Sequence, residues 1–413
     1  MIRTTTAVLT AALALVVAAC GGGSSGGGSA PVAGGKATGT INVWAWGNEG
    51  EILGKLTKEF EAENPGVKVK VTSIPVDASH DKILTSIAGG QSPDVAMVGT
   101  TWMGELARTQ SLEEAPASID QSQFFKGAAD TVKVDGKTYG VPWYVETRLL
   151  YYRTDIAKKA GITEAPKTWD ELKAMARAMQ DKGGAKYGIN LSTNNWQEYL
   201  PFVWQAGGDL AQGDKFTLNT PQGAEATGFY KSFADEGLSP NTTKQGFDIT
   251  PAFVRGTHPM FFSGPWHMGL IKEAGGAGFD KKWAVAPMPT KETNTSFVGG
   301  SNWAVFKSTK NRDAAWKFVE WTAKPETQAK WYEISSDLPA NQAAWDLPAL
   351  KDDPNVEVFG QQLENAKSPP PFPKWEEIGT ALNTELDKVI RSKDTGAQGA
   401  EQLEKTVDSI GTA

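Results

Sequence analysis

The apolar residues in the first quarter of the chain follow two different periods in turn. Two short, mostly apolar runs at residues 41–46 and 94–98 and an alternating stretch at residues 67–71 predict strands. Two stretches with apolar residues every three or four positions predict helices, at residues 52–60 and 83–87. Strand, helix, strand, helix and strand at this spacing are typical of βαβ units, so the pattern predicts an α/β fold with a parallel sheet.

Beyond residue 130 the pattern changes to hairpins, single strands and longer helices. Residues 132–139 alternate around Asp135-Gly136, which predicts a tight hairpin. Residues 145–153 predict one continuous strand, and Thr168 with Glu171 forms a capping box that opens a helix reaching about residue 181. Further strands are expected at 259–263, 284–286 and 298–306, and further helices at 197–206, 221–236 and over most of the chain after 306.

The first residues of the chain have the pattern of an export signal. Arg3 supplies a positive charge, and the apolar run from Ala7 to Ala19 is too short to span a bilayer with the usual flanks. The chain's one cysteine, Cys20, ends this run, and the Gly- and Ser-rich residues 20–38 predict a flexible tether. A cysteine at this point resembles the bacterial lipobox, which implies removal of residues 1–19 and a lipid on Cys20. The alternative is an ordinary exported protein with an incidental thiol.

Composition narrows the class of ligand. A net charge of −7 argues against nucleic acid, which requires a basic surface to displace counterions. The chain has 15 Trp and 3 His, so aromatic surface is abundant and metal ligands are scarce. Tryptophan offers a flat apolar face with one donor on its edge, and the C–H faces of sugars stack on such rings. A single cysteine also means that no internal disulfide can form, so the fold depends on its core.

Five segments, in order along the chain, resemble the extracellular solute-binding proteins of carbohydrate ABC importers, the group that includes maltose-binding protein. Each segment is weakly specific alone, and the long third one is the most specific. They are INVWAWG (41–47) with NPGVKVKV (64–71), GQSPDVAMVG (90–99), GVPWYVETRLLYYRTDIAKKAG (140–161), PMFFSGPW (259–266) and FVGGSNWAVF (297–306).

The resemblance implies a two-lobed, type II periplasmic-binding-protein-like fold with the ligand in a cleft between the lobes. Each α/β lobe would be discontinuous in sequence, and hinge strands would join the two. The expected first lobe comprises residues 39–145 plus 297–322. The expected second lobe comprises residues 146–296 plus 323–413.

Candidate ligand residues follow the first and third strands, because ligands in open α/β sheets bind at the carboxyl ends of strands. Trp46 and Glu49 come after the first strand, where they could stack on a sugar and accept its hydroxyls, although Trp46 could instead fill the core. Thr100, Thr101 and Trp102 come after the third strand, and either threonine could simply cap the next helix. Thr101 and Trp102 replace the Asp and Arg of maltose-binding protein, so the site should differ from a maltodextrin site in detail.

A second group of candidates is polar. Tyr144, Glu146 and Arg148 fall on one face of the predicted strand 145–153 and its start, by alternation. Glu146 matches a ligand-binding glutamate of the family, and a carboxylate beside a guanidinium suits a ligand with hydroxyls. A salt bridge between the lobes is the structural alternative. Asp77 and His80, after the second strand, are further candidates for hydrogen bonding.

The remaining candidates lie in the second part of the chain, including the expected hinge segment at residues 299–302. Trp266 and Trp375 match stacking positions of the family, and Trp196 opens a helix at the expected edge of the cleft. Gly300 would let the backbone approach a ligand, and Asn302 could donate and accept, although a plain tight turn fits this segment as well. Three rings at apolar helical spacing are expected in the core: Trp316, Trp321 and Trp331.

Enzyme motifs are absent from the sequence outside the Gly- and Ser-rich tether: there is no G-x-S-x-G, Walker loop, H-E-x-x-H or Cys/His metal pattern. A glycoside hydrolase could use Glu49, Asp77 and Glu146 as its carboxylates, but the pattern has too few strand–helix units for an eightfold barrel. We therefore expect a binding protein without cofactor or metal. Two alternatives stay open, a binding protein for a polyol phosphate such as a glycerophosphodiester, and a surface adhesin or sensor.

The expected partners are a carbohydrate of two or more rings, the permease subunits of an ABC importer and the lipid on Cys20. Hydrolysis of ATP would occur on separate subunits, which fits the missing Walker loop. The protein should be a monomer, exported and held at the outer face of the bacterial cell membrane.

Overall fold

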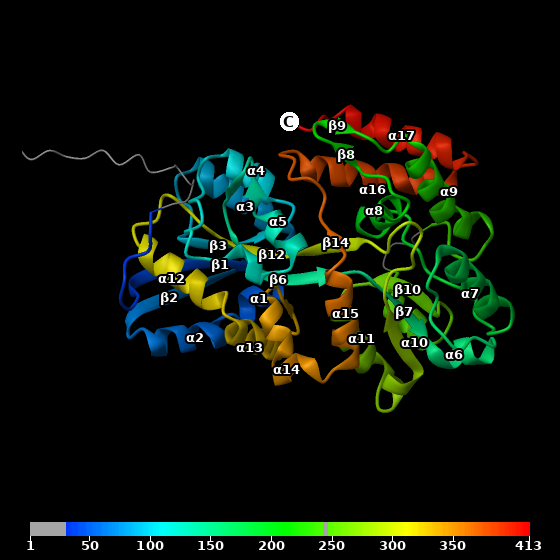
Figure 1. Cartoon of the computed structure of the whole chain (residues 1–413), viewed down its shortest axis with the longest axis horizontal. Helices are drawn as coiled ribbons and strands as arrows, with labels where there is room; N and C mark the ends of the chain where they lie inside the picture. The colour runs from blue at the N-terminus through cyan, green and yellow to red at the C-terminus, as the bar shows by residue number, and fades with distance from the viewer. Residues whose placement is uncertain (1–29, 243–246) are drawn as a thin grey trace, which may run out of the picture.

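The computed structural model describes residues 30–242 and 247–413, so Cys20 and the export signal lie outside the described residues. Figure 1 shows two α/β lobes side by side, with strands β6 and β12 running between them. The strands are β1 (Thr38–Trp46), β2 (Gly66–Ile74), β3 (Val95–Gly99), β4 (Lys133–Val134), β5 (Lys137–Thr138), β6 (Val141–Thr147), β7 (Leu149–Arg153), β8 (Ala211–Gln212), β9 (Lys215–Phe216), β10 (Met260–Ser263), β11 (Trp283–Ala286), β12 (Ser296–Val305), β13 (Leu338–Pro339) and β14 (Ala366–Lys367).

Helices surround both sheets. They are α1 (Gly47–Ile52), α2 (Gly54–Glu63), α3 (Val76–Ala88), α4 (Met103–Arg108), α5 (Lys126–Thr131), α6 (Thr154–Lys159), α7 (Trp169–Asp181), α8 (Trp196–Gln205), α9 (Pro221–Asp235), α10 (Ile249–Val254), α11 (Trp266–Gly275), α12 (Arg312–Thr322), α13 (Pro325–Ser335), α14 (Pro348–Lys351), α15 (Pro354–Leu363), α16 (Trp375–Arg391) and α17 (Gly396–Asp408). Among the described residues, none of these helices is long and apolar enough to cross a membrane.

The sheet of the first lobe has the strand order β13-β6-β12-β3-β1-β2, with β14 pairing β12. Strand β1 pairs in parallel with β2 and with β3, as the βαβ pattern predicted. Strand β12 runs antiparallel to both β3 and β6 and lies between them inside the sheet. All five residues of β3 are buried, which explains why its sequence is an unbroken apolar run.

The second lobe contains a smaller antiparallel sheet with the order β10-β7-β11. Its middle strand shows that the prediction of one continuous strand over 145–153 was wrong. The chain forms β6 in the first sheet, breaks at Arg148 and continues as β7 in the second sheet. Hydrophobic alternation gave no sign of this break, because residues on both sides of Arg148 are buried.

Two large buried clusters form the cores. One cluster packs the first sheet against α2, α12 and α13, and it extends to one face of β7 through Tyr151. The other packs α7, α8, α9, α16 and α17 against the opposite face of the second sheet, through Leu150. The two clusters therefore cover opposite faces of the second sheet.

We keep the two-lobe division as a proposal with one change to its limits. Residues 325–339 were expected in the second lobe, yet Trp331 of α13 packs on Trp143 with ring centroids 5.3 Å apart. Strand β13 also pairs with β6 of the first sheet. Both contacts assign α13 and β13 to the first lobe.

Several local predictions are confirmed. Strands β4 and β5 form the predicted hairpin, and Asp135 and Gly136 at its turn both have positive φ. Thr168 and Glu171 cap α7 reciprocally, as the capping box requires. The three helix-embedded rings Trp316, Trp321 and Trp331 are all buried in the first cluster.

The core of the first lobe depends on Trp143, which is buried between Trp303 and Trp331 at centroid distances of 5.5 and 5.3 Å. We expect Trp143→Ala to lower the free energy of unfolding by about 3–5 kcal/mol, since it leaves a cavity in a packed core. Urea denaturation followed by far-UV circular dichroism measures this loss. Leu270→Ala, at an exposed position on α11, is the matched control and should change stability by less than about 0.5 kcal/mol. Equal effects of both variants would contradict this description of the core.

Candidate functional site

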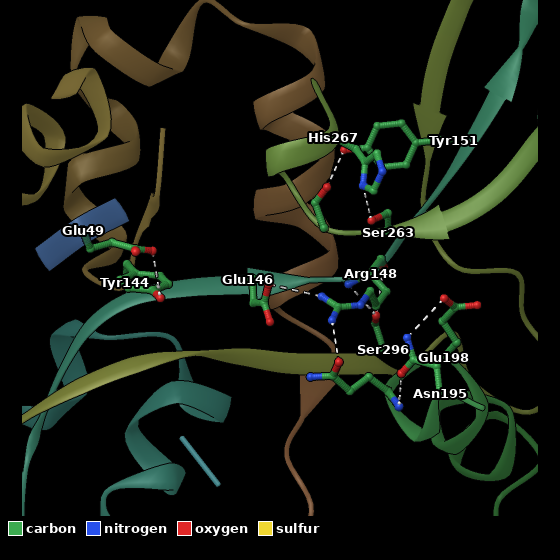
Figure 2. A network of polar contacts seen from close by, with 12 residues as sticks. Glu49, Tyr144, Glu146, Arg148, Tyr151, Asn195, Glu198, Ser263, His267 and Ser296 are labelled. Atoms are coloured by element: carbon green, nitrogen blue, oxygen red, sulfur yellow. Dashed lines mark hydrogen bonds and ion pairs between the residues drawn. The ribbon is translucent and has the colours of Figure 1, made fainter. Parts of the chain in front are cut away.

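A buried guanidinium, that of Arg148, lies where the chain passes from β6 to β7. Its Nη1 is 3.3 Å from Oε2 of Glu146, and its Nη2 donates to Oε1 of Gln197 at 3.1 Å (Figure 2). The backbone of Arg148 is held as well: Ser296 Oγ accepts from its N–H at 3.2 Å and donates to its carbonyl at 2.9 Å. Elements of both lobes therefore fix this side chain in place, and the Glu146–Arg148 pair exists although the strand predicted to align it is broken.

An exposed indole ring lies directly beside this guanidinium. The guanidinium carbon of Arg148 is 4.9 Å from the ring centroid of Trp266, the first residue of α11. Trp266 is 42% exposed, in contrast to most tryptophans of the chain. A Cβ on Gly264 would be 1.9 Å from the ring, so only glycine lets Trp266 fold back over the turn before α11.

The turn that carries Trp266 is held by hydrogen bonds from the second sheet. Tyr151 Oη donates to the carbonyl of Gly264 at 2.7 Å, and Ser263 Oγ lies 2.6 Å from Nδ1 of His267 (Figure 2). Burial lowers the pKa of His267 to about 4, so its ring is neutral near pH 7. The exposed ring of Trp266 is thus mounted on a rigid, uncharged turn.

Carboxylates gather on the side of the first lobe. Tyr144 Oη donates to Oε1 of Glu49 at 3.4 Å, and Glu49 is the third residue of α1 (Figure 2). Burial, with the charge of Glu146 adding to it, raises the pKa of Glu49 above its ordinary value. Burial and the charge of Glu49 raise the pKa of Asp337 to about 8, although Trp331 Nε1 donates to that carboxyl at 2.9 Å. This part of the site is rich in hydrogen-bond acceptors.

The loop after β3 brings further aromatic surface to the same lobe. Trp102 lies 5.8 Å from Trp46 and 5.3 Å from His80, measured between ring centroids. Trp46 Nε1 donates to the carbonyl of Met97 at 3.1 Å, and His80 Nε2 is 2.8 Å from Oε2 of Glu105. The structure therefore brings three of the predicted residues, Trp46, His80 and Trp102, into one cluster whose orientation is fixed.

The two lobes meet at this loop. Thr101 Oγ1 donates to Oε1 of Glu376 at 3.3 Å, which joins the end of β3 to the first turn of α16. A pocket of about 250 Å³ opens there, lined from the first lobe by Thr101 and Trp102 and from the second lobe by α8 and α16. Its walls include Trp196 and Trp375, which contact each other edge to face at 4.8 Å. Trp375 is only 2% exposed here, so it presents little ring surface to a ligand.

Three other predicted residues do not line this pocket, and the backbone of a fourth is part of α3. Asn302 is 1% exposed and donates to Thr131 Oγ1 at 3.1 Å, so its amide is used inside the first lobe. Thr100 lines a different cavity, of about 720 Å³, together with Thr131 and α5. Gly300 has φ +114°, and a Cβ there would be 2.1 Å from the Tyr144 carbonyl, so its glycine serves strand packing between β12 and β6. Asp77 lies in the first turn of α3.

Two residues that the sequence reasoning missed are Gln197 and Glu198. Gln197 bonds Arg148 and lines the interlobe pocket, and Glu198 accepts from the backbone N–H of Ser192 at 3.1 Å. Burial raises the pKa of Glu198 to about 7. The available signal was the segment Asn195-Trp196-Gln197-Glu198, in which a cap residue precedes two polar side chains at the start of an otherwise apolar helix.

Stability should fall with rising pH because of two carboxyl groups. The pKa values of Glu198 and Asp337 rise from 4.5 and 3.8 to about 7 and about 8 on folding. At a pH between the unfolded and the folded pKa of each group, the folded chain binds more protons than the unfolded chain. The stabilisation that is fully present below about pH 4 is therefore lost as the pH rises through the folded pKa values of about 7 and about 8. Urea denaturation at several pH values from 5 to 8 would show this slope.

The double variant Glu198→Gln, Asp337→Asn should flatten that slope, because the side chains no longer titrate. Glu377→Gln, at an exposed position on α16, is the control and should leave it unchanged. A slope identical in the double variant and the parent chain would contradict this assignment.

No group of three or more His, Cys, Asp or Glu side chains that could hold a metal occurs among residues 30–242 and 247–413. The arrangement instead offers an exposed ring, an ion pair and several acceptors around the junction of two lobes. Such a site can bind a ligand that has both apolar faces and hydroxyl groups.

Comparison with known proteins agrees with this architecture. The family model for bacterial extracellular solute-binding proteins matches residues 44–329, more than half of the chain. A putative binding protein of Brucella abortus is 29% identical over 355 residues, covering 83% of this chain and 86% of that protein. A maltotriose-binding protein of Pyrococcus abyssi is 27% identical over 372 residues, covering 86% and 78%.

Among solved structures, the sugar-binding protein MalE of Xanthomonas citri superposes with a TM-score of 0.86 at 33% identity, covering 90% of this chain and 97% of that one. The two-lobed, type II binding-protein fold expected from the sequence is therefore confirmed. The relatives are binding proteins, which also confirms the expectation of a protein that is not an enzyme. The chain belongs to the family of bacterial extracellular solute-binding proteins, the group that its five sequence segments resembled.

Proposed function

We propose that this protein captures a sugar of two or more rings between its lobes and delivers it to an ABC permease while a lipid on Cys20 holds it at the cell membrane. The names of the relatives support the ligand class, since the Pyrococcus protein is named for maltotriose and the Xanthomonas protein for sugar binding. The position of Cys20 at the end of the export signal supports the lipid anchor.

The observation that carries the proposal is the exposed ring of Trp266 beside the Glu146–Arg148 pair. A pyranose has an apolar C–H face that can cover an indole and a rim of hydroxyls that require donors and acceptors. Trp266 supplies the first, while Glu146 accepts and Arg148 donates. A sugar can therefore use the exposed ring and the ion pair at the same time.

Contacts from the first lobe would make binding favour a closed arrangement of the lobes. Glu49, Trp46 and Trp102 belong to the first lobe, whereas Trp266, Trp196 and Gln197 belong to the second. A sugar that touches both sets binds the closed arrangement better than the open one and shifts the population toward it. A permease can then distinguish loaded from empty protein by shape.

The charges of the site favour a neutral ligand over a phosphodiester. Arg148 already lies against Glu146 and Gln197, so its charge is balanced before any ligand arrives. The carboxylate of Glu146, which lies beside Arg148, would repel a phosphate that approached the guanidinium. We therefore place the polyol-phosphate alternative second to a neutral sugar.

The energy required is within reach of such a site. Micromolar binding corresponds to about −8 kcal/mol, and one buried pyranose face plus several charge-assisted hydrogen bonds can supply this after the cost of ordering the ligand. Sites of this kind are largely preformed, as the fixed turn of Trp266 is here.

A titration series over mono-, di- and trisaccharides, followed by tryptophan fluorescence and calorimetry, tests the ligand class. We expect at least one di- or trisaccharide to bind, and Trp266→Ala to weaken it by about 10- to 100-fold because the stacking surface is lost. Trp345→Ala, a half-buried ring that contacts Phe125 in the first lobe, is the matched control and should bind as the parent does. Absence of binding to every carbohydrate, or equal affinity of the parent and Trp266→Ala, would refute the proposal.

The anchor is tested separately, on the full chain in a bacterial host. Metabolic labelling with a palmitate analogue should label the parent chain, and Cys20→Ser should abolish the label because no other thiol exists. Ser29→Ala, a change within the same tether sequence, should keep the label. Label that persists in Cys20→Ser would show that the acylation site is elsewhere.

A further inference from the structure

The first described residues of the chain, 30–37, lie against α12 at the outer edge of the first lobe. Figure 1 shows this blue segment beside α12. Arg312 Nη2 donates to the carbonyl of Ala30 at 2.7 Å, and Lys317 Nζ donates to the carbonyls of Gly34 and Lys36 at 3.5 and 3.4 Å. The second half of the tether predicted over 20–38 is therefore bound to the folded body.

Four basic side chains surround a pocket at this place. The pocket has a volume of about 470 Å³, and we call it the tether-exit pocket; its basic residues are Lys36, Lys310, Arg312 and Lys317. Asp313 also lines it, and Arg312 forms an ion pair with Glu113 at 2.8 Å. Four positive charges against two negative ones leave a local excess of about +2 in a chain whose net charge is −7.

The three lysines of this pocket are not neutralised by neighbouring carboxylates in the part of the chain that the structure describes. Within the described residues, none of Lys36, Lys310 and Lys317 lies within ion-pair distance of a carboxylate, and Lys36 and Lys310 are exposed. By comparison, Lys68 pairs with Glu61 at 3.1 Å and Lys367 with Asp209 at 2.8 Å. The pocket therefore has unbalanced positive charge available to an external anion.

The short distance in sequence between this pocket and Cys20 limits how far the pocket can lie from the membrane. Residues 21–29 separate Cys20 from Ala30, and an extended chain covers at most about 3.5 Å per residue. If Cys20 carries a lipid, Ala30 stays within about 35 Å of the membrane that holds it. The charged surface that this pocket meets most often is then the membrane itself.

We propose that the tether-exit pocket binds the phosphate groups of anionic phospholipids in the membrane that carries the anchor. Ammonium and guanidinium groups are the side chains that bind lipid phosphates. The interaction is short in range, because charges are screened beyond about 8 Å at physiological salt. It adds to the anchor, since a tethered pocket meets headgroups at high effective concentration.

This docking would act on one lobe only, because all four basic residues belong to the first lobe and its N-terminal extension. The first lobe would be held against the membrane, and the second lobe would stay free to move relative to it. The inference rests on the proposed lipid anchor for the nearness of the membrane, but the pocket's affinity for anionic lipid is measurable without the anchor.

Vesicle sedimentation tests the pocket directly. The protein used is residues 21–413, which retains every residue of the two core clusters and lacks both leader and cysteine. At low salt we expect it to bind phosphatidylcholine vesicles containing phosphatidylglycerol and not vesicles of phosphatidylcholine alone. The double variant Lys36→Gln, Lys310→Gln should lower the partition coefficient by about 25-fold, about 5-fold for each lysine. Raising the salt concentration should weaken binding of the parent in the same direction.

The matched control is Lys215→Gln, Lys393→Gln, which removes the same charge from exposed positions of the second lobe. It should bind anionic vesicles as the parent does, and circular dichroism should show both double variants folded. Equal binding of the two double variants, or no preference of the parent for phosphatidylglycerol, would overturn the proposal. Sugar titration of the same samples separates this outcome from the proposed function, because neither pair of lysines lines the site around Arg148 and Trp266.

Discussion

The arrangement of both lobes depends on one buried guanidinium. Arg148 occupies the single residue between two strands that belong to different sheets, and its side chain is held by Glu146 of the first sheet and Gln197 of α8. A buried charge is costly unless it is paired and hydrogen-bonded, so its partners must stay in place. These contacts join the two lobes where the chain crosses between them, and the ring of Trp266 lies beside the same guanidinium.

The two lobes contribute different side chains to the site around this crossing. The first lobe contributes acceptors, Glu49 and Asp337, and a cluster of rings around Trp102. The second contributes the exposed ring of Trp266 on a turn held by Tyr151. The exposed ring of Trp266 and the carboxyl of Glu49 thus come from different lobes. A ligand that needs both therefore stabilises their approach, which is the physical basis of capture by a two-lobed protein.

The sequence was sufficient for the fold class, the parallel βαβ start, the hairpin and the capped helix, because each has a local signature in period or turn residues. Predictions about the site succeeded where the evidence for them lay within one short segment of the sequence. The Glu146–Arg148 contact and the exposure of Trp266 follow from short segments, and the structure places these side chains together. The break at Arg148 could not be seen, because alternation gives the period of a strand and not the sheet to which it belongs.

Other features depended on contacts between distant elements. From the sequence, the side chain of Asn302 could face either a ligand or the interior. In the structure it faces the interior, where it donates a hydrogen bond to Thr131 of α5. The burial of Trp375 results from its contact with Trp196 of another helix. The pKa of Glu198 is raised by its surroundings in the second core, which no single segment encodes. Family resemblance supplied positions for rings, but the accessibility of each ring is a property of the assembled lobes.

The most direct test of the central claim is a crystal structure of the protein with the sugar that binds it most tightly. We predict a pyranose face against Trp266, a hydroxyl within hydrogen-bond distance of Glu146, and at least one further contact from Glu49, Trp46 or Trp102 of the first lobe. A sugar bound elsewhere, or one that contacts a single lobe while the Glu146–Arg148 region stays empty, would contradict it.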